Sequence, residues 1–163
     1  MSTATPERPG ADALIPVHVH GVVRDENTET HIVVLRDEQG QDVLPIWVGL
    51  AEGNAIRLAQ EGIVTPRPMT HDLIRNVATH LGVQISRVVI SDVKKTTYYA
   101  TVYLTSKGVD RTLDARPSDA IALAIRAACP MFVTKDVLDR RVNINAEAWL
   151  NRAAVQKADS QEV

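Results

Sequence analysis

The pattern of hydrophobic and polar positions predicts two β-meanders interleaved with helices. In the first half, runs rich in Val, Ile and Leu, separated by the polar turns "RDENTE" and "EQG", predict a β-meander over residues 14–23, 30–37 and 41–48. Apolar residues at helical spacing in "GLAEGNAIRLAQEG" then predict a helix. Pro45 lies in the third run and cannot donate a backbone hydrogen bond, so we expect that strand at a sheet edge or a bulge.

A second helix and a second meander follow the proline-rich loop "IVTPRPMT". The segment "HDLIRNVATHLG" predicts a helix that ends at Gly82, with an apolar stripe formed by Leu73, Ile74, Val77 and Leu81. The short turns "KKT" and "KG" then separate the strands of a second predicted meander, over residues 84–93, 97–106 and 109–115. The chain therefore contains two meanders, each followed or preceded by a helix.

An alanine-rich helix opening at Pro117, a short "MFVT" strand and one or two helical segments through Trp149 complete the prediction. Two β-meanders interleaved with helices predict an α+β fold with a mostly antiparallel sheet. Since a three-stranded meander is barely stable alone, we expect both to share a single compact domain. The polar ends of the chain predict a disordered N-terminal tail over residues 1–12, a folded domain over 13–150 and a flexible C-terminal tail over 151–163.

Composition narrows the class of protein. The chain has 163 residues, of which 45% are hydrophobic and 23% charged, as in ordinary globular domains. A net charge of −2 argues against a protein that coats nucleic acid by bulk charge, and the lone Cys129 excludes an internal disulfide. The N-terminus has no signal-peptide pattern, and no apolar run reaches the ~18 residues that a membrane span needs. We therefore expect a cytoplasmic protein without membrane association.

The stretch "LDARPSDAIALAIRAA" concentrates charge where a strand meets a helix. Pro117 suits the first helical position, and Asp119 in the first turn suits the positive end of the helix dipole. These local rules do not require Asp114 or Arg116 on the approach to the helix. The junction is therefore either part of a charge-handling site or a salt-bridge cluster in which Arg116 pairs with Asp114, Asp119 or Glu52.

Two further groups of residues carry candidate chemistry. Glu52 lies where a strand leads into a helix, and His71 lies at a helix start beside the proline-rich loop. Stabilisation of its own helix also explains each of them. Basic residues next to alternating aromatic ones can bind single-stranded nucleic acid by phosphate contact and stacking, although aromatic residues also pack across strands. The residues of this second group are Lys94, Lys95, Tyr99 and Tyr103.

Five ordered segments resemble the bifunctional nuclease (BFN) domain family. They are "LPIWVGLAEGNAI", "RPMTHDLIRNV", "VVISDV", "YYATVYL" and "LDARPSDAIALAIR", and the resemblance covers roughly residues 14–140. It implies a compact α+β domain with DNase and RNase activity that self-associates, most simply as a two-fold dimer. The expected partners are thus DNA or RNA and a second copy of the chain.

The resemblance and the residue chemistry together give our leading hypothesis, a metal-assisted phosphodiesterase acting on DNA and RNA. The metal ligands would be Glu52, Asp114 and Asp119, because Mg²⁺ and Mn²⁺ prefer oxygen ligands. Arg116 would neutralise a phosphate oxygen, and His71 would serve as acid or base. The alternative is a non-enzymatic interaction or regulatory module whose charged cluster is structural. Three carboxylates converging in an open cleft would favour the enzyme, and a cluster of ion pairs centred on Arg116 would favour the alternative.

Overall fold

The computed structural model describes residues 13–141, 148, 151 and 152. The strands are β1 (Leu14–Asp25), β2 (Thr30–Asp37), β3 (Val43–Val48), β4 (Gln84–Lys94), β5 (Thr97–Ser106), β6 (Val109–Ala115) and β7 (Met131–Thr134). The helices are α1 (Leu50–Gln60), α2 (Thr70–His80), α3 (Pro117–Ala127) and α4 (Lys135–Arg140). Both predicted meanders and the short strand after α3 are confirmed to within two residues at each end.

Within the described residues the strands form one sheet, in the order β3-β2-β1-β7-β4-β5-β6. Neighbouring strands are antiparallel except β4 and β7, so the prediction of a mostly antiparallel α+β fold is confirmed. β3 is an edge strand, as predicted for the strand that contains Pro45. β7 lies between β1 and β4 and joins the two meanders into a single sheet.

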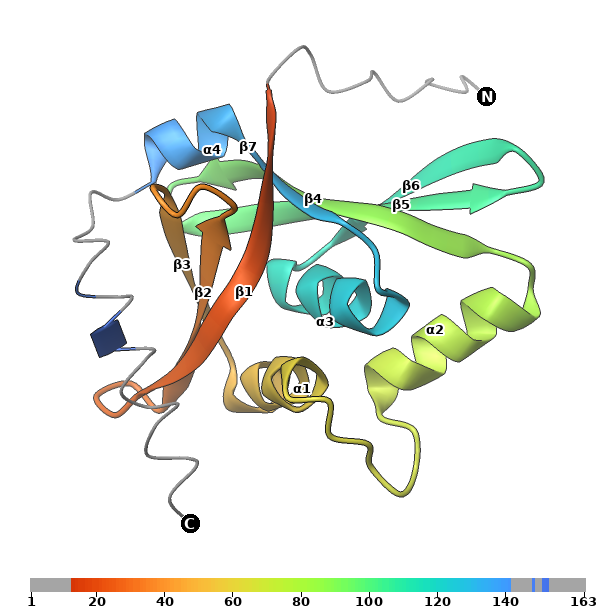
Figure 1. Cartoon of the computed structure of the whole chain (residues 1–163), viewed down its shortest axis with the longest axis horizontal. Helices are drawn as coiled ribbons and strands as arrows, with labels where there is room; N and C mark the ends of the chain where they lie inside the picture. The colour runs from red at the N-terminus through yellow and green to blue at the C-terminus, as the bar shows by residue number, and fades with distance from the viewer. Residues whose placement is uncertain (1–12, 142–147, 149–150, 153–163) are drawn as a thin grey trace.

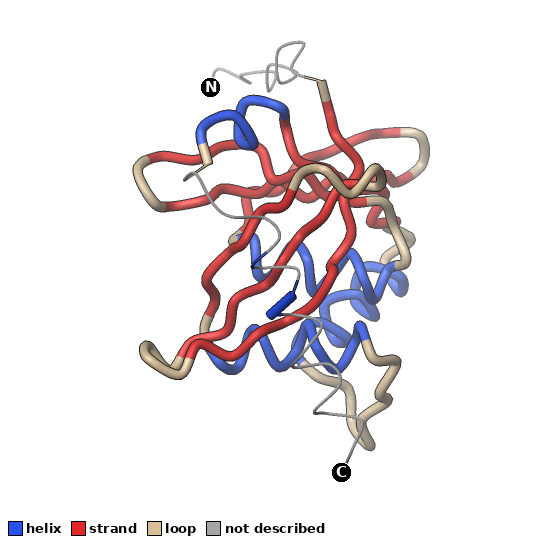
Figure 2. The backbone as a smooth tube through the Cα atoms, turned by 60° about the vertical axis from the view of Figure 1, so that its left-hand side comes forward, coloured by secondary structure: helices blue, strands red, loops and turns tan. Residues whose placement is uncertain are grey.

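The sheet is strongly twisted, and the helices fill the corner that the twist creates. In Figure 1, β1–β3 run vertically while β4–β6 run horizontally, and α1, α2 and α3 lie in the angle between them. Figure 2 shows these three helices gathered on one side of the sheet. The buried core draws on both halves, with Val33, Leu44, Val88 and Val102 in one cluster. The two meanders therefore form a single compact domain.

The alanine-rich α3 is the centre of the helix layer. It lies between α1 and α2, and six of its residues are buried: Ser118, Ala120, Ile121, Ala122, Leu123 and Ala124. Small side chains let neighbouring helices approach closely, which explains why the first turns of α1 and α3 can meet.

The predicted tails fall mainly outside the described residues. Residues 1–12 are not described, and of residues 151–163 only 151 and 152 are, both helical. Of the helical segments predicted through Trp149, α4 and residue 148 are described, and residues 142–147 between them lie outside the described part. No helix in the described ranges is long and apolar enough to cross a membrane.

Candidate functional site

Arg116 is the residue around which the charged side chains gather. It links the end of β6 to α3, where Pro117 takes the first helical position as the sequence predicts. Its Nε donates to Asp119 Oδ2 at 2.8 Å and its Nη2 to Asp119 Oδ1 at 3.1 Å. Its Nη1 donates to Glu52 Oε1 at 3.2 Å, across 64 residues of sequence. The guanidinium thus joins the first turns of α1 and α3 while 64% of its side chain stays exposed.

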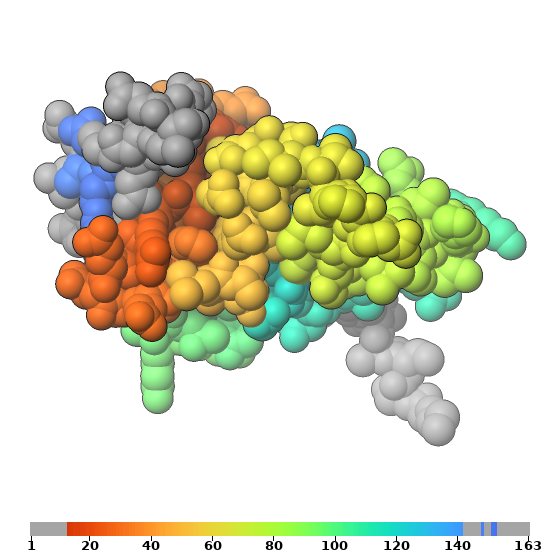
Figure 3. Space-filling view, turned by 90° about the horizontal axis from the view of Figure 1, so that it is seen from below, coloured from red at the N-terminus to blue at the C-terminus, as the bar shows by residue number. Residues whose placement is uncertain are grey.

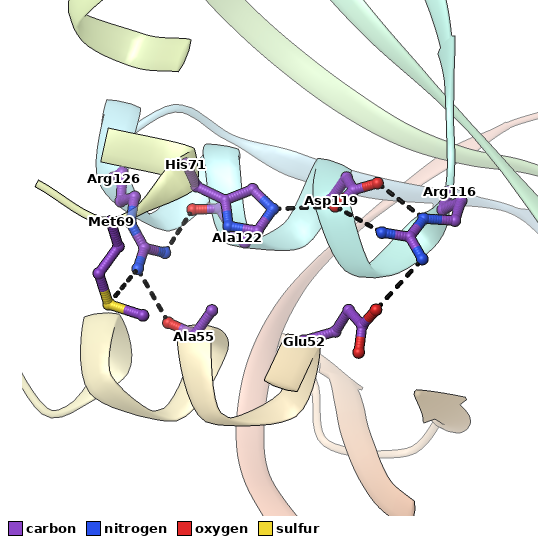
Figure 4. A network of polar contacts seen from close by, with 8 residues as sticks. All are labelled: Glu52, Ala55, Met69, His71, Arg116, Asp119, Ala122 and Arg126. Carbon is purple, nitrogen blue, oxygen red and sulfur yellow. Dashed lines mark hydrogen bonds and ion pairs between the residues drawn. The ribbon is translucent and has the colours of Figure 1, made fainter. Parts of the chain in front are cut away.

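Asp119 is shared between Arg116 and a histidine from a third helix. His71 Nε2 lies 2.9 Å from Asp119 Oδ1, so this carboxylate takes part in three hydrogen bonds (Figure 4). Burial works to raise the pKa of the Asp119 carboxyl, but the hydrogen bonds from Arg116 and His71 outweigh it and hold this pKa below its ordinary value. Asp119 is therefore ionised near neutral pH and is a weak proton acceptor.

His71 supports Asp119 from behind. The side chain of His71 is only 9% exposed, against 29% for Asp119 and 27% for Glu52. An ionised carboxylate can only accept hydrogen bonds, so Nε2 of His71 must carry the proton it shares with Asp119. Because the imidazole is buried, it is placed to orient Asp119 and not to contact a ligand.

Each of the three helices carries a carboxylate at its third position: Glu52 in α1, Asp72 in α2 and Asp119 in α3. The free N–H groups of a helix start attract negative charge, which favours carboxylates there. We name Glu52, His71, Arg116 and Asp119 the Arg116 cluster. Its two carboxylates, Glu52 and Asp119, both contact the Arg116 guanidinium, so this positive charge connects the first turns of α1 and α3.

A second arginine, Arg126, fixes α2 against the other helices. Its side chain is 6% exposed, and its Nε donates to Asp72 Oδ1 at 3.0 Å. The same guanidinium donates to the carbonyl oxygens of Ala55 and Ala122, both at 3.1 Å (Figure 4). The sequence analysis did not identify Arg126 as a site residue. The one local feature that could have indicated it is a basic residue in the last turn of an otherwise apolar helix.

A pocket of about 360 Å³ adjoins the Arg116 cluster. Arg116 and Glu52 form part of its lining, together with two aromatic residues that the sequence did not single out, Trp47 and Tyr98. Trp47 is 51% exposed although it lies in β3, next to the buried Ile46. The pocket therefore combines a positive group, a carboxylate and aromatic rings.

Asp114 does not join the Arg116 cluster, so its predicted convergence with Asp119 is wrong. Side chains alternate along a strand, and Asp114 pairs with Thr101 on β5, whereas the next residue, Ala115, pairs with the buried Ala100. Asp114 consequently lies on the sheet face away from the helices. It is exposed, and its side chain has no hydrogen bond or ion pair with any described residue.

Comparison with known proteins decides the family. A family model described as "Bifunctional nuclease domain" matches residues 33–145, more than half of the chain. The chain belongs to the bifunctional nuclease domain family. The matched range contains all four members of the Arg116 cluster and both members of the Asp72–Arg126 pair.

Individual proteins are also similar to this chain. An "Uncharacterized protein" of Mycobacterium tuberculosis is 39% identical over 124 residues, covering 75% of this chain and 73% of the relative. "Bifunctional nuclease 1" of Oryza sativa subsp. japonica is 31% identical over 66% of this chain, and "Bifunctional nuclease 2" of Arabidopsis thaliana is 29% identical over 63% of it. The chain covers about a third of the length of these two plant proteins.

The arrangement in this bifunctional nuclease domain does not fit a divalent cation at the predicted position. Glu52 and Asp119 are both bound to Arg116, and Asp114 lies elsewhere. Among the residues described, no group of three or more His, Cys, Asp or Glu side chains is placed to hold a metal ion. The three predicted ligands therefore do not form one site in this arrangement, and metal dependence itself stays a prediction.

The predicted substrate-binding residues lie on the other face of the sheet. Tyr99 and Tyr103 alternate with the core residues of β5 and point away from the helices. The Lys94 ammonium lies 5.0 Å from the ring centre of Tyr99, and the Arg87 guanidinium lies 4.2 Å from that of Tyr103. Lys95 occupies the β4–β5 turn with φ of 57°. This basic and aromatic face of the BFN domain is separate from the Arg116 cluster.

Proposed function

We propose that this chain hydrolyses phosphodiester bonds of DNA and RNA at the Arg116 cluster. The family assignment supports a nuclease, since the plant relatives carry that name. The observation that carries the choice of site is the exposed Arg116 guanidinium, held in place by two carboxylates beside a pocket with aromatic walls. A planar guanidinium fixed in one orientation is suited to recognise a phosphate group.

Arg116 keeps capacity to bind such a group. A guanidinium has five N–H donors, and three are used on Asp119 and Glu52, so two N–H groups are left for a phosphate oxygen. The same guanidinium would neutralise charge that develops on phosphorus when water attacks. Aromatic rings in the pocket wall, such as Trp47, would contact a neighbouring base.

Glu52 is the best candidate for the base that takes a proton from the attacking water. Asp119 already accepts three hydrogen bonds, whereas Glu52 accepts one and lines the pocket. The leaving oxygen would be protonated from solvent. In this scheme His71 is a positioning residue, which differs from the acid or base role that the sequence suggested.

The alternative, an interaction module with a structural cluster, has one observation in its favour. Two carboxylates surround one guanidinium, so Glu52, Arg116 and Asp119 together carry a net negative charge. Such a cluster attracts a phosphate less strongly than a free arginine does. The two functions predict different effects of shape-preserving substitutions, so one experiment distinguishes them.

The experiment follows cleavage of fluorescent single-stranded and double-stranded DNA and RNA by the purified full chain. Glu52→Gln and Asp119→Asn are compared with Asp114→Asn, an exposed aspartate outside the cluster that serves as the matched control. We expect Glu52→Gln to lower the rate by about 100-fold or more, the usual contribution of a positioned base, with an unchanged melting temperature. Asp114→Asn should retain full activity.

Other outcomes would reject the proposal. Equal cleavage by all three variants would assign the activity to another site or to a contaminating host nuclease. Loss of thermal stability in Asp119→Asn with unchanged specific activity would favour the structural role. Parallel reactions with Mg²⁺, Mn²⁺ or EDTA test the metal dependence that the sequence predicts, independently of which side chains are involved.

A further inference from the structure

The apolar stripe of α2 faces outward. This helix turns its polar side towards α3: His71 contacts Asp119, Asp72 pairs with Arg126, and Arg75 donates to the Arg126 carbonyl oxygen. Its only buried residue is His71. The exposed fractions of the apolar stripe are 57% for Leu73, 44% for Ile74, 50% for Val77 and 72% for Leu81. We call these four residues the α2 apolar face.

Strand β6 adds to this surface. Val109 and Leu113 are 53% and 52% exposed, and Leu113 pairs with the buried Val102, so both point to the side of the sheet that carries the helices. The helix layer ends before β6 and leaves them uncovered. At the end of α2, the hydroxyl of Ser106, which pairs with Val109, donates to the Gly82 carbonyl oxygen at 3.1 Å. Figure 1 shows the β5–β6 hairpin and the end of α2 at the same end of the molecule, and Figure 3 shows them next to each other.

The chain's own described residues do not cover the α2 apolar face. Arg152, near the C-terminus, is close enough to Asp25 at the end of β1 to influence the pKa of that carboxyl. Figure 1 shows this segment and α2 on opposite sides of the molecule. Residues 1–12, "MSTATPERPGAD", contain no Leu, Ile, Val or aromatic residue that could bury such a surface.

A second copy of the chain matches the surface in area and in shape. Six aliphatic side chains, each about half exposed or more, present on the order of 500 Å² of exposed apolar surface. Two copies together would bury about twice that area, which approaches the ~1,200 Å² of a specific interface before any surrounding polar residues are counted. Residues three, four and eight positions apart make a straight ridge along a helix, which can pack against its own copy across a two-fold axis. A membrane surface fits less well, since α2 has no lysine and Arg75 is bound to the Arg126 carbonyl.

The family resemblance implies self-association but not the surface that is used; we propose that the α2 apolar face, together with Val109 and Leu113, forms the interface of a two-fold symmetric homodimer. The interface begins two residues after His71, so dimerisation would hold in place the helix that orients Asp119. This proposal does not depend on nuclease activity.

The test is the molar mass by light scattering from low to high micromolar concentration. The wild-type chain should have about twice the monomer mass of 17.9 kDa. Val77→Lys should give the monomer mass with an unchanged melting temperature, because the side chain is half exposed. Val64→Lys is the matched control: Val64 is 91% exposed in the loop before α2, outside the proposed interface, and its variant should remain dimeric.

A milder substitution keeps the test informative if Val77→Lys does not fold. Leu81→Ala should weaken the dimer at low concentration while both partners stay folded. The proposal is overturned if the wild-type chain is monomeric throughout, or if Val77→Lys stays dimeric like Val64→Lys. A monomeric wild-type chain that binds vesicles of zwitterionic and anionic lipid, and loses this binding in Val77→Lys, would also overturn the dimer. The α2 apolar face would then be a membrane-contact surface.

Discussion

Asp72→Asn tests whether the buried Arg126 guanidinium depends on its one carboxylate partner. The substitution preserves shape, and the asparagine side-chain oxygen can still accept from the Met69 N–H, which lies 2.9 Å from Asp72 Oδ2. It leaves Arg126, only 6% exposed, without an opposite charge. Breaking a fully buried ion pair costs about 3–5 kcal/mol. Here the guanidinium keeps two carbonyl acceptors and the carboxylate is 24% exposed, so we expect a loss of about 2–3 kcal/mol.

This loss is measurable by urea denaturation followed by circular dichroism. The transition midpoint should fall with an unchanged slope, and the melting temperature should drop by roughly 5–10 °C for a chain of this length. The matched control is Asp139→Asn, since Asp139 pairs with Lys135 and both side chains are about 60% exposed. The control should change stability by less than about 0.5 kcal/mol. Equal, small effects of the two substitutions would refute the idea that Arg126 requires Asp72.

Three further predictions concern other regions. Gly53→Ala should destabilise the protein by about 1–3 kcal/mol in thermal melts despite the better helix propensity of alanine, because the added Cβ would overlap the Cβ and the ring of His31. The same substitution should cost less in a His31→Gly background, which removes the overlapping Cβ. The free energy of unfolding should decrease as the pH drops below about 4, because the pKa of Asp119 is lower in the folded than in the unfolded state and the unfolded state therefore binds more protons. Asp119→Asn should make stability depend less on pH in this acid range, and an unchanged pH dependence would contradict the assigned cause. Tyr103→Ala should weaken binding of a labelled single-stranded oligonucleotide by about 1–3 kcal/mol in fluorescence anisotropy if the predicted substrate face is correct, and unchanged affinity would remove that face from consideration.

Local patterns determined the elements of the fold, and contacts distant in sequence determined the site. The limits of β6 and the start of α3 at Pro117 follow from neighbouring residues, namely the "KG" turn and the fixed φ of proline. The partnership of Arg116 with Glu52 spans 64 residues and depends on how close α1 and α3 approach each other. The sequence could offer Glu52 only as one of several candidates.

Two differences between expectation and structure have specific causes. Asp114 was grouped with Asp119 by closeness in sequence, but strand alternation turned it to the opposite face. The α2 apolar stripe was recognised, yet its direction was not predictable, because the polar contacts of His71, Asp72 and Arg75 fix which side of the helix meets α3. Periodicity shows that a helix has an apolar side and leaves open what that side meets.

The position of β7 has a consequence for the synthesis of the protein. Among the described strands, β7 is the last to leave the ribosome, and yet it lies in the middle of the sheet, with β1 on one side and β4 on the other. Until residues 131–134 emerge, the nascent chain can hold only two separate three-stranded sheets whose inner edges are both unpaired. Open strand edges recruit other chains, so slow or prematurely terminated translation before β7 would produce aggregation-prone fragments. A stop codon after Cys129 would therefore remove far more than a short C-terminal segment, because it would divide the sheet in two.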